Sequence, residues 1–177
     1  MAKFVRKIGI LGGSFNPIHH GHLFMACAAM EGIGLKQVIF VPAHCSPHKT
    51  DRDLAPAKDR LAMTRLAVRG QKDFIVSDVE IKRGGISYTV DTARYFRRCY
   101  PKNQLFFIIG EDSVKGLGDW KNIDGILSIL SFIAVNREHC PVSSSQIRRC
   151  LSRKQSIEGL TPAAVTGYIR QKGLYVQ

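Results

Sequence analysis

Long apolar stretches are missing from this chain of 177 residues. The late apolar run 126–135 is too short to cross a bilayer and is interrupted by Ser128 and Ser131. The basic start of the chain precedes only a short apolar run that breaks at Gly12, so we expect no signal peptide. These features exclude an ordinary membrane-spanning helix and predict no membrane partner.

Cysteine pairs with a recognisable spacing are also missing. The five cysteines are scattered along the chain and no C-x-x-C occurs, which indicates free thiols in a reducing compartment. We therefore expect a cytoplasmic protein. His44, Cys45 and His48 lie close together in the sequence, but their spacing matches no zinc pattern. The sequence accordingly predicts no metal held by protein side chains.

Acidic residues are scarce, with 14 Asp and Glu against 26 Lys and Arg, and the net charge is +12. Such a charge fits polyanionic partners, namely nucleotides, pyrophosphate or nucleic acid, and does not choose among them. The basic residues are spread along the chain and accompany no recognisable nucleic-acid reader motif. We therefore expect small nucleotides as ligands and no nucleic acid.

Apolar runs typical of strands recur at 5–11, 37–42, 74–79, 104–109 and 130–136. Segments with a helical pattern lie between them, at 22–33, 57–69, 89–100 and 123–127. This alternation predicts an α/β fold, a doubly wound and mostly parallel sheet with helices on both faces. In such a sheet, ligands bind at the carboxyl ends of the strands.

The last part of the chain has no strand pattern. Serines 143–145 can cap a helix that begins near Gln146. Thr161 and the proline after it open a second helix, 163–172, which Gly173 ends.

We therefore predict one domain over 1–177, with an α/β core at 1–142 and a small helical appendage at 143–177. The glycine pairs at 84–85 and at 116 and 118 indicate loops.

The segment 12–22 carries the strongest functional signal. A strand, a glycine turn and a helix start in this order are typical of a phosphate-binding unit. Gly12 and Gly13 remove side chains where a phosphate would approach the backbone. His19 and His22 are three residues apart at the helix start, so both rings can point the same way. The segment predicts an anion clamp; the alternative is a tight turn with two surface histidines.

The same segment reads Gly-x-Phe-x-Pro-x-His-x-Gly-His from Gly13 to His22 and resembles the signature of the nucleotidyltransferases. The resemblance implies their Rossmann-like fold and a catalytic role for His19 and His22 in stabilising the transition state. It also implies contacts to ATP from Gly12, Gly13, Ser14 and Phe15.

Two later strings resemble the nicotinate-nucleotide adenylyltransferases. Ser-Tyr-Thr-x-Asp-Thr begins at Ser87, and Gly110-x-Asp112 precedes Trp120. The resemblance implies that Thr89 lies beside a pyridine ring, that Trp120 stacks on it, and that Gly110 and Asp112 bind the ATP ribose. From the residues alone, the default for Thr89 is a helix-start residue. The alternative for the only tryptophan is core packing, and its place in a loop with Gly and Asp favours stacking.

The late segment 142–148 is similar to the family's Ile-Ser-Ser-Thr-x-Ile-Arg, with Ser145 in place of the threonine. The resemblance implies that the three serines, Ser143, Ser144 and Ser145, and Arg148 grip ATP phosphates. It further places Lys49 over the triphosphate and Arg137 near the mononucleotide phosphate. The family usually has a longer link before this segment, where only 138–142 intervene here.

Together these motifs imply transfer of the adenylyl group of ATP to nicotinate mononucleotide, giving deamido-NAD and pyrophosphate. The resemblance implies Mg²⁺, bound mainly through the ATP phosphates. Both the acid and the amide mononucleotide are compatible with the motifs, and a homo-oligomer is compatible with the chain. The alternatives are a pantetheine-phosphate adenylyltransferase, a basic nucleic-acid-binding protein on the same fold, and a weakly active sensor of NAD precursors.

Overall fold

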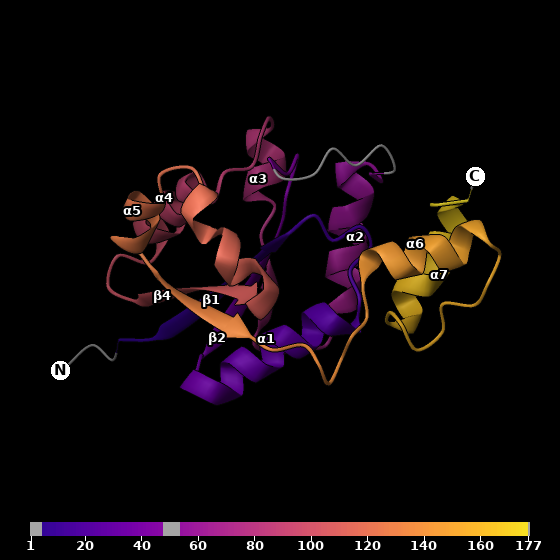
Figure 1. Cartoon of the computed structure of the whole chain (residues 1–177), viewed down its shortest axis with the longest axis horizontal. Helices are drawn as coiled ribbons and strands as arrows, with labels where there is room; N and C mark the ends of the chain where they lie inside the picture. Colours follow the sequence, from indigo (N-terminus) through magenta and orange to yellow (C-terminus); the bar gives the residue numbers. More distant parts are fainter. Residues whose placement is uncertain (1–4, 48–53, 177) are drawn as a thin grey trace.

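The computed structural model describes residues 5–47 and 54–176. Five strands form one sheet in the order β3-β2-β1-β4-β5, and every paired strand is parallel to its neighbour (Figure 1). The strands are β1 (Lys7–Gly13), β2 (Gln37–Pro42), β3 (Phe74–Val76), β4 (Gln104–Gly110) and β5 (Ser131–Val135).

The helices fall between the strands and after them. They are α1 (His20–Ile33), α2 (Ala57–Ala67), α3 (Val79–Arg83), α4 (Thr89–Cys99), the 3₁₀ helix η1 (Glu111–Asp119), α5 (Ile123–Leu127), α6 (Ser144–Ser152) and α7 (Ala163–Lys172).

The predicted doubly wound α/β fold is confirmed by this order. Strand β1 lies in the middle of the sheet, with β2 on one side and β4 on the other. The chain runs outward from β1 through β2 to β3 and then returns to β4, so the strand order reverses between β1 and β4. A crevice at the carboxyl ends of these two strands is where such sheets bind ligands.

Alternating apolar residues along the strands build a core on each face of the sheet. On one face, Val38, Phe40 and Ile108 pack with helices α1, α2, α6 and α7. On the other face, Ile39 and Phe107 pack with α4 and α5. Both faces are covered, which explains why the strands read as nearly continuous apolar runs.

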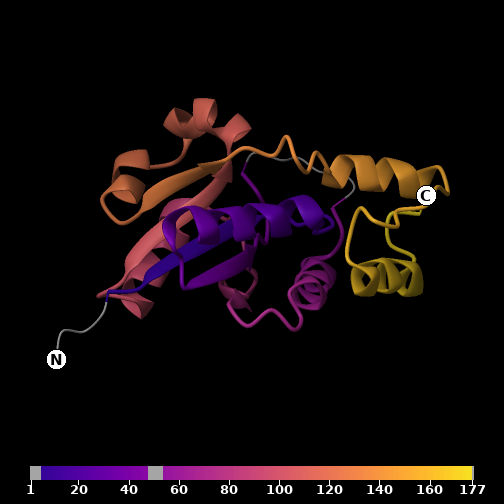
Figure 2. The same ribbon diagram turned by 90° about the horizontal axis from the view of Figure 1, so that it is seen from below.

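Helices α6 and α7 lie together beside α2, at the end of the molecule far from the start of β1 (Figures 1 and 2). Besides the shared apolar core, hydrogen bonds attach the C-terminal part to the segment after β1. The Thr161 hydroxyl donates to the Ile18 carbonyl at 2.8 Å, and the Ser144 hydroxyl donates to the Pro17 carbonyl at 2.9 Å. The C-terminal part therefore holds the loop that carries the histidines. No described helix is long and apolar enough to span a membrane.

Two stretches differ from the sequence prediction. The third strand ends at Val76, and Val79 instead begins α3. The segment with Gly116 and Gly118, predicted as a loop, forms the 3₁₀ helix η1. Strand β3 lies at the sheet edge and pairs with β2 along three residues.

Candidate active site

A cavity of about 360 Å³ lies at the carboxyl ends of β1 and β4, where the fold predicts a ligand crevice. It is lined by the loop after β1, the start of α1, the end of β4 and the start of α6. The sequence-predicted residues that line it are Gly12, Gly13, Ser14, Phe15, His22, Gly110, Asp112, Trp120, Arg137, Ser144 and Arg148. We call this cavity the phosphate cleft.

The two histidines lie side by side at the start of α1. Their ring centroids are 3.7 Å apart, and the ring planes are tilted by 30°. His19 is 2% exposed, whereas His22 is half-buried and lines the phosphate cleft. The backbone N–H of His19 donates to Nδ1 of His22 at 3.3 Å, so the proton of a neutral His22 ring lies on Nε2. His22 can therefore donate from Nε2 to an anion.

Arg148 joins the cleft from the other end of the sequence. Its guanidinium donates to the Asn16 carbonyl at 2.8 Å and lines the same cleft as His22. The two motifs, 132 residues apart at this contact, thus meet at one cavity. The guanidinium keeps further N–H donors, which suit phosphate oxygens.

The three serines before Arg148 have different surroundings. Ser143 caps α6 by accepting from the N–H of Gln146 at 3.1 Å. Ser144 lines the phosphate cleft, and its hydroxyl donates a hydrogen bond to the Pro17 carbonyl. Ser145 is exposed and lines a neighbouring hollow between α6 and residues 173–176. The cleft with His22 therefore contains Ser144 and not Ser145.

Asp112 and Arg137 form an ion pair of 2.7 Å beside the end of β4. A Cβ atom on Gly110 would lie 2.3 Å from Oδ1 of Asp112 and 3.2 Å from Nε of Arg137. Glycine at 110 thus lets the pair rest against the strand end. The pair brings together a residue predicted for the ATP ribose and one predicted for the mononucleotide.

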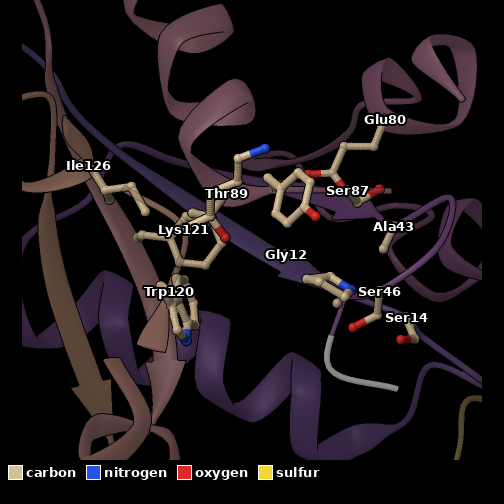
Figure 3. A pocket seen from close by; sticks show the side chains of 14 residues that line it. Gly12, Ser14, Ala43, Ser46, Glu80, Ser87, Thr89, Trp120, Lys121 and Ile126 are labelled. Atoms are coloured by element: carbon tan, nitrogen blue, oxygen red, sulfur yellow. The ribbon is translucent and has the colours of Figure 1, made fainter. Parts of the chain in front are cut away.

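A second cavity of about 150 Å³ lies next to the phosphate cleft, at the end of β1. Figure 3 shows Trp120, Lys121 and Ile126 on one side of it and Ser14, Ala43 and Ser46 on the other. Thr89, at the start of α4, also lines it. We call it the ring pocket.

Trp120 packs against core aromatics and also lines the groove, while its stacking on a pyridine ring stays a prediction. Its ring packs edge-on against Phe107, with centroids 5.8 Å apart, and against Phe132, at 5.7 Å. It is also half-buried and lines both the ring pocket and the phosphate cleft. The cavities share Gly12, Gly13, Ser14, Phe107 and Trp120, so they form two halves of one groove.

Two charged residues of the ring pocket were not predicted from the sequence. The Lys121 ammonium lies 4.0 Å from the centroid of the Tyr88 ring. Glu80 is 6% exposed and accepts a hydrogen bond from the Thr92 hydroxyl. Burial raises the pKa of the Glu80 carboxyl, partly offset by hydroxyl donors from Thr92 and Ser87. No sequence signal separates either residue from an ordinary surface charge.

Lys49 lies outside the described residues. Among the residues that are described, no three His, Cys, Asp or Glu side chains gather where they could hold a metal ion. Asp112 is the carboxylate in the phosphate cleft, and it is ion-paired with Arg137. This lining fits a divalent ion carried by substrate phosphates rather than one held in a cage of protein carboxylates.

The family model described as cytidylyltransferase-like matches residues 10–150. The nicotinate-nucleotide adenylyltransferase of Bacillus subtilis is 36% identical over 187 residues, which cover 97% of this chain and 99% of the relative.

Among solved structures, a Vibrio parahaemolyticus protein matches with a TM-score of 0.81, covering 97% of this chain and 96% of its own, at 20% identity. Plasmodium falciparum nicotinic acid mononucleotide adenylyltransferase complexed with NaAD matches with a TM-score of 0.77 at 18% identity, covering 96% of this chain and 97% of its own.

Proposed function

Because the chain belongs to the cytidylyltransferase-like family, and within it to the nicotinate-nucleotide adenylyltransferases, we propose that it joins ATP and nicotinate mononucleotide. The products are deamido-NAD and pyrophosphate. The observation that carries the proposal is the shared cleft of His22 and Arg148, which continues into a pocket lined by Trp120 and Thr89.

The phosphate cleft takes the triphosphate of ATP in this proposal. Gly12, Gly13, Ser14 and Phe15 present backbone to it, and Ser144 and Arg148 contact it from α6. In this proposal Lys49, which lies outside the described residues, also binds the triphosphate, as do Ser143 and Ser145 at the start of α6. Mg²⁺ arriving on the ATP phosphates supplies further shielding of their negative charge.

The ring pocket takes the pyridine mononucleotide. Trp120 offers an aromatic face, and Thr89 offers a hydroxyl at the start of α4. Lys121 and the Arg137 guanidinium supply positive charge for the mononucleotide phosphate. Gly110 and Asp112 lie at the cleft side of the groove, where the ATP ribose is placed.

The reaction needs no protein nucleophile. An oxygen of the mononucleotide phosphate attacks the α-phosphorus of ATP, and the bond from the α-phosphorus to the bridging oxygen breaks. Pyrophosphate leaves with that electron pair. Two unit charges about 4 Å apart repel by about 4 kcal/mol at an effective dielectric near 20, so positioning and cationic stabilisation are the main tasks.

His22 and Arg148 both line the cleft and supply the donors that position and stabilise the phosphates in this proposal. The Nε2–H of His22 donates to a phosphate oxygen as negative charge shifts toward pyrophosphate. His19 lies buried against His22, and in this proposal both histidines stabilise the transition state. Such preorganised donors typically contribute about 10²–10³-fold to turnover.

The test is pyrophosphate release with ATP and each of three acceptors: nicotinate mononucleotide, nicotinamide mononucleotide and phosphopantetheine. We expect release with the nicotinate compound at a rate well above the other two. Release only with phosphopantetheine would assign the protein to the pantetheine-phosphate adenylyltransferases. Salt-dependent binding of oligonucleotides without pyrophosphate release would contradict the enzyme altogether.

A further inference from the structure

Arg60 is a fully buried arginine that neither motif contains. It lies in the first turn of α2, and 1% of its surface is exposed. The guanidinium makes four hydrogen bonds to main-chain carbonyls. They go from Nε to Ala55 at 2.9 Å, from Nη1 to Ser14 at 2.7 Å and Ala43 at 2.6 Å, and from Nη2 to His44 at 2.8 Å.

These carbonyls belong to separate segments that meet at the groove. Ser14 follows β1, and Ala43 and His44 follow β2. One nitrogen, Nη1, bonds to both loops, so the guanidinium fixes the distance between them. Ser14 lines both halves of the groove, and Ala43 lines the ring pocket.

The bond to Ser14 also sets the orientation of the next peptide unit. In a trans peptide the C=O and N–H point in opposite directions. The Ser14 carbonyl points at Arg60, so the Phe15 N–H points away from it. Phe15 itself has φ of 47°, in the left-handed region that bulky residues avoid. This loop conformation therefore needs bonds from outside the loop to hold it.

We propose that Arg60 is a positioning residue for adenylyl transfer: it holds the loops after β1 and β2 so that the Ser14–Phe15 peptide presents its N–H to the phosphate cleft. The inference rests on the proposed function of that cleft. A lysine would keep the charge but not the planar fork, which supplies donors in fixed directions. The role thus depends on the shape of the guanidinium.

The experiment compares Arg60→Lys and Arg60→Gln with Thr64→Val. Thr64 is buried one turn further along α2, and its hydroxyl bonds only to the Arg60 carbonyl among the contacts described. We expect kcat of Arg60→Lys to fall about 10-fold or more, on the scale of a misplaced donor, with KM for the mononucleotide within about 3-fold of wild type. Thr64→Val should lower the melting temperature and leave kcat per folded molecule unchanged.

Thermal stabilisation by inorganic tripolyphosphate gives a second readout that needs no turnover. Wild type and Thr64→Val should gain melting temperature with tripolyphosphate, and both Arg60 variants should gain clearly less. An inactive wild type that tripolyphosphate stabilises more than the Arg60 variants would contradict the proposed function but not the positioning of the cleft loops by Arg60. A folded Arg60→Lys with wild-type kcat would overturn that role, and unfolding of both Arg60 variants would assign the residue to the fold alone.

Discussion

The imidazole rings of His19 and His22 lie 3.7 Å apart, one buried and the other open to the phosphate cleft. His22 lines the cleft, and His19 lies behind it in the protein interior. A variant of His22 tests the role proposed for the residue that lines the cleft.

His22→Ala should lower kcat by roughly 10²-fold or more in a protein that still folds, because it removes one preorganised donor from the cleft. Steady-state pyrophosphate release measures kcat, and thermal denaturation checks that the variant folds. His20→Ala is the matched control in the same turn, and it should keep most of the activity. Near-normal turnover of a purified His22→Ala protein would contradict the assigned role.

Gly21 lies between His19 and His22 in the sequence. A substitution at this position tests how closely α1 approaches the link before α6. A Cβ at this position would lie 3.0 Å from Nδ1 of His19 and 3.1 Å from the Val142 carbonyl. Gly21→Ala should therefore destabilise the fold by about 1–3 kcal/mol and lower kcat. Gly32→Ala in the same helix is the control, since its Cβ would meet nothing within 4 Å. That variant should be neutral or slightly more stable, as measured by urea denaturation.

Trp120 is the only tryptophan, so its fluorescence reports directly on the groove. Nicotinate mononucleotide should change the emission in a saturable manner, because the ring lines the pocket that we assign to it. Trp120→Phe should raise KM for the mononucleotide more than KM for ATP. An emission spectrum that does not respond at saturating mononucleotide, in a protein that is active, would place the pyridine ring elsewhere.

Glu80 links stability to pH. Burial raises the pKa of its carboxyl from about 4.5, so the folded state favours the protonated form. The stability that this proton supplies is complete below pH 4.5 and is lost as pH rises through the folded pKa. Glu80→Gln removes the charge and keeps an oxygen that accepts from Thr92. The variant should therefore gain melting temperature relative to wild type at pH 8 and lose that advantage toward pH 4.5.

The control for this pH series is Glu31→Gln, which neutralises an exposed carboxylate on α1. At pH 8, the melting temperature of Glu31→Gln should differ less from that of wild type than the melting temperature of Glu80→Gln does. If Glu80→Gln were less stable than wild type at pH 8, the hydrogen bonds to Thr92 and Ser87 would outweigh the cost of burying the charge.

The sequence predicts the sheet well because buried parallel strands are apolar on both faces and therefore form continuous apolar runs. The run that ends before Gly110, which forms β4, is an example. That His22 and Arg148 line one cleft is predicted only because their two motifs occur in the order found in the family. The 3₁₀ helix η1 was missed because Gly116 and Gly118 have low helix propensity. Its position follows from contacts with β4 and β5 that no local pattern records.

Charged residues show the clearest limit of sequence reasoning. Arg60 and Glu80 are both buried, although an arginine or a glutamate in a helix is ordinarily expected in solvent. What buries Arg60 is a set of carbonyls from three segments, which come together only in the folded chain. Ser145 is a different case, because the motif predicts a phosphate contact that stays a prediction, while its exposed side chain lines the hollow between α6 and residues 173–176.

The attachment of α6 to the loop after β1 has a consequence for synthesis on the ribosome. The sheet strands are complete once β5 has emerged, whereas Arg148 follows β5 in the chain and emerges later. The central sheet can thus form before Arg148 is available to the phosphate cleft. The cleft as we propose it is complete only after α6 has folded onto the loop after β1.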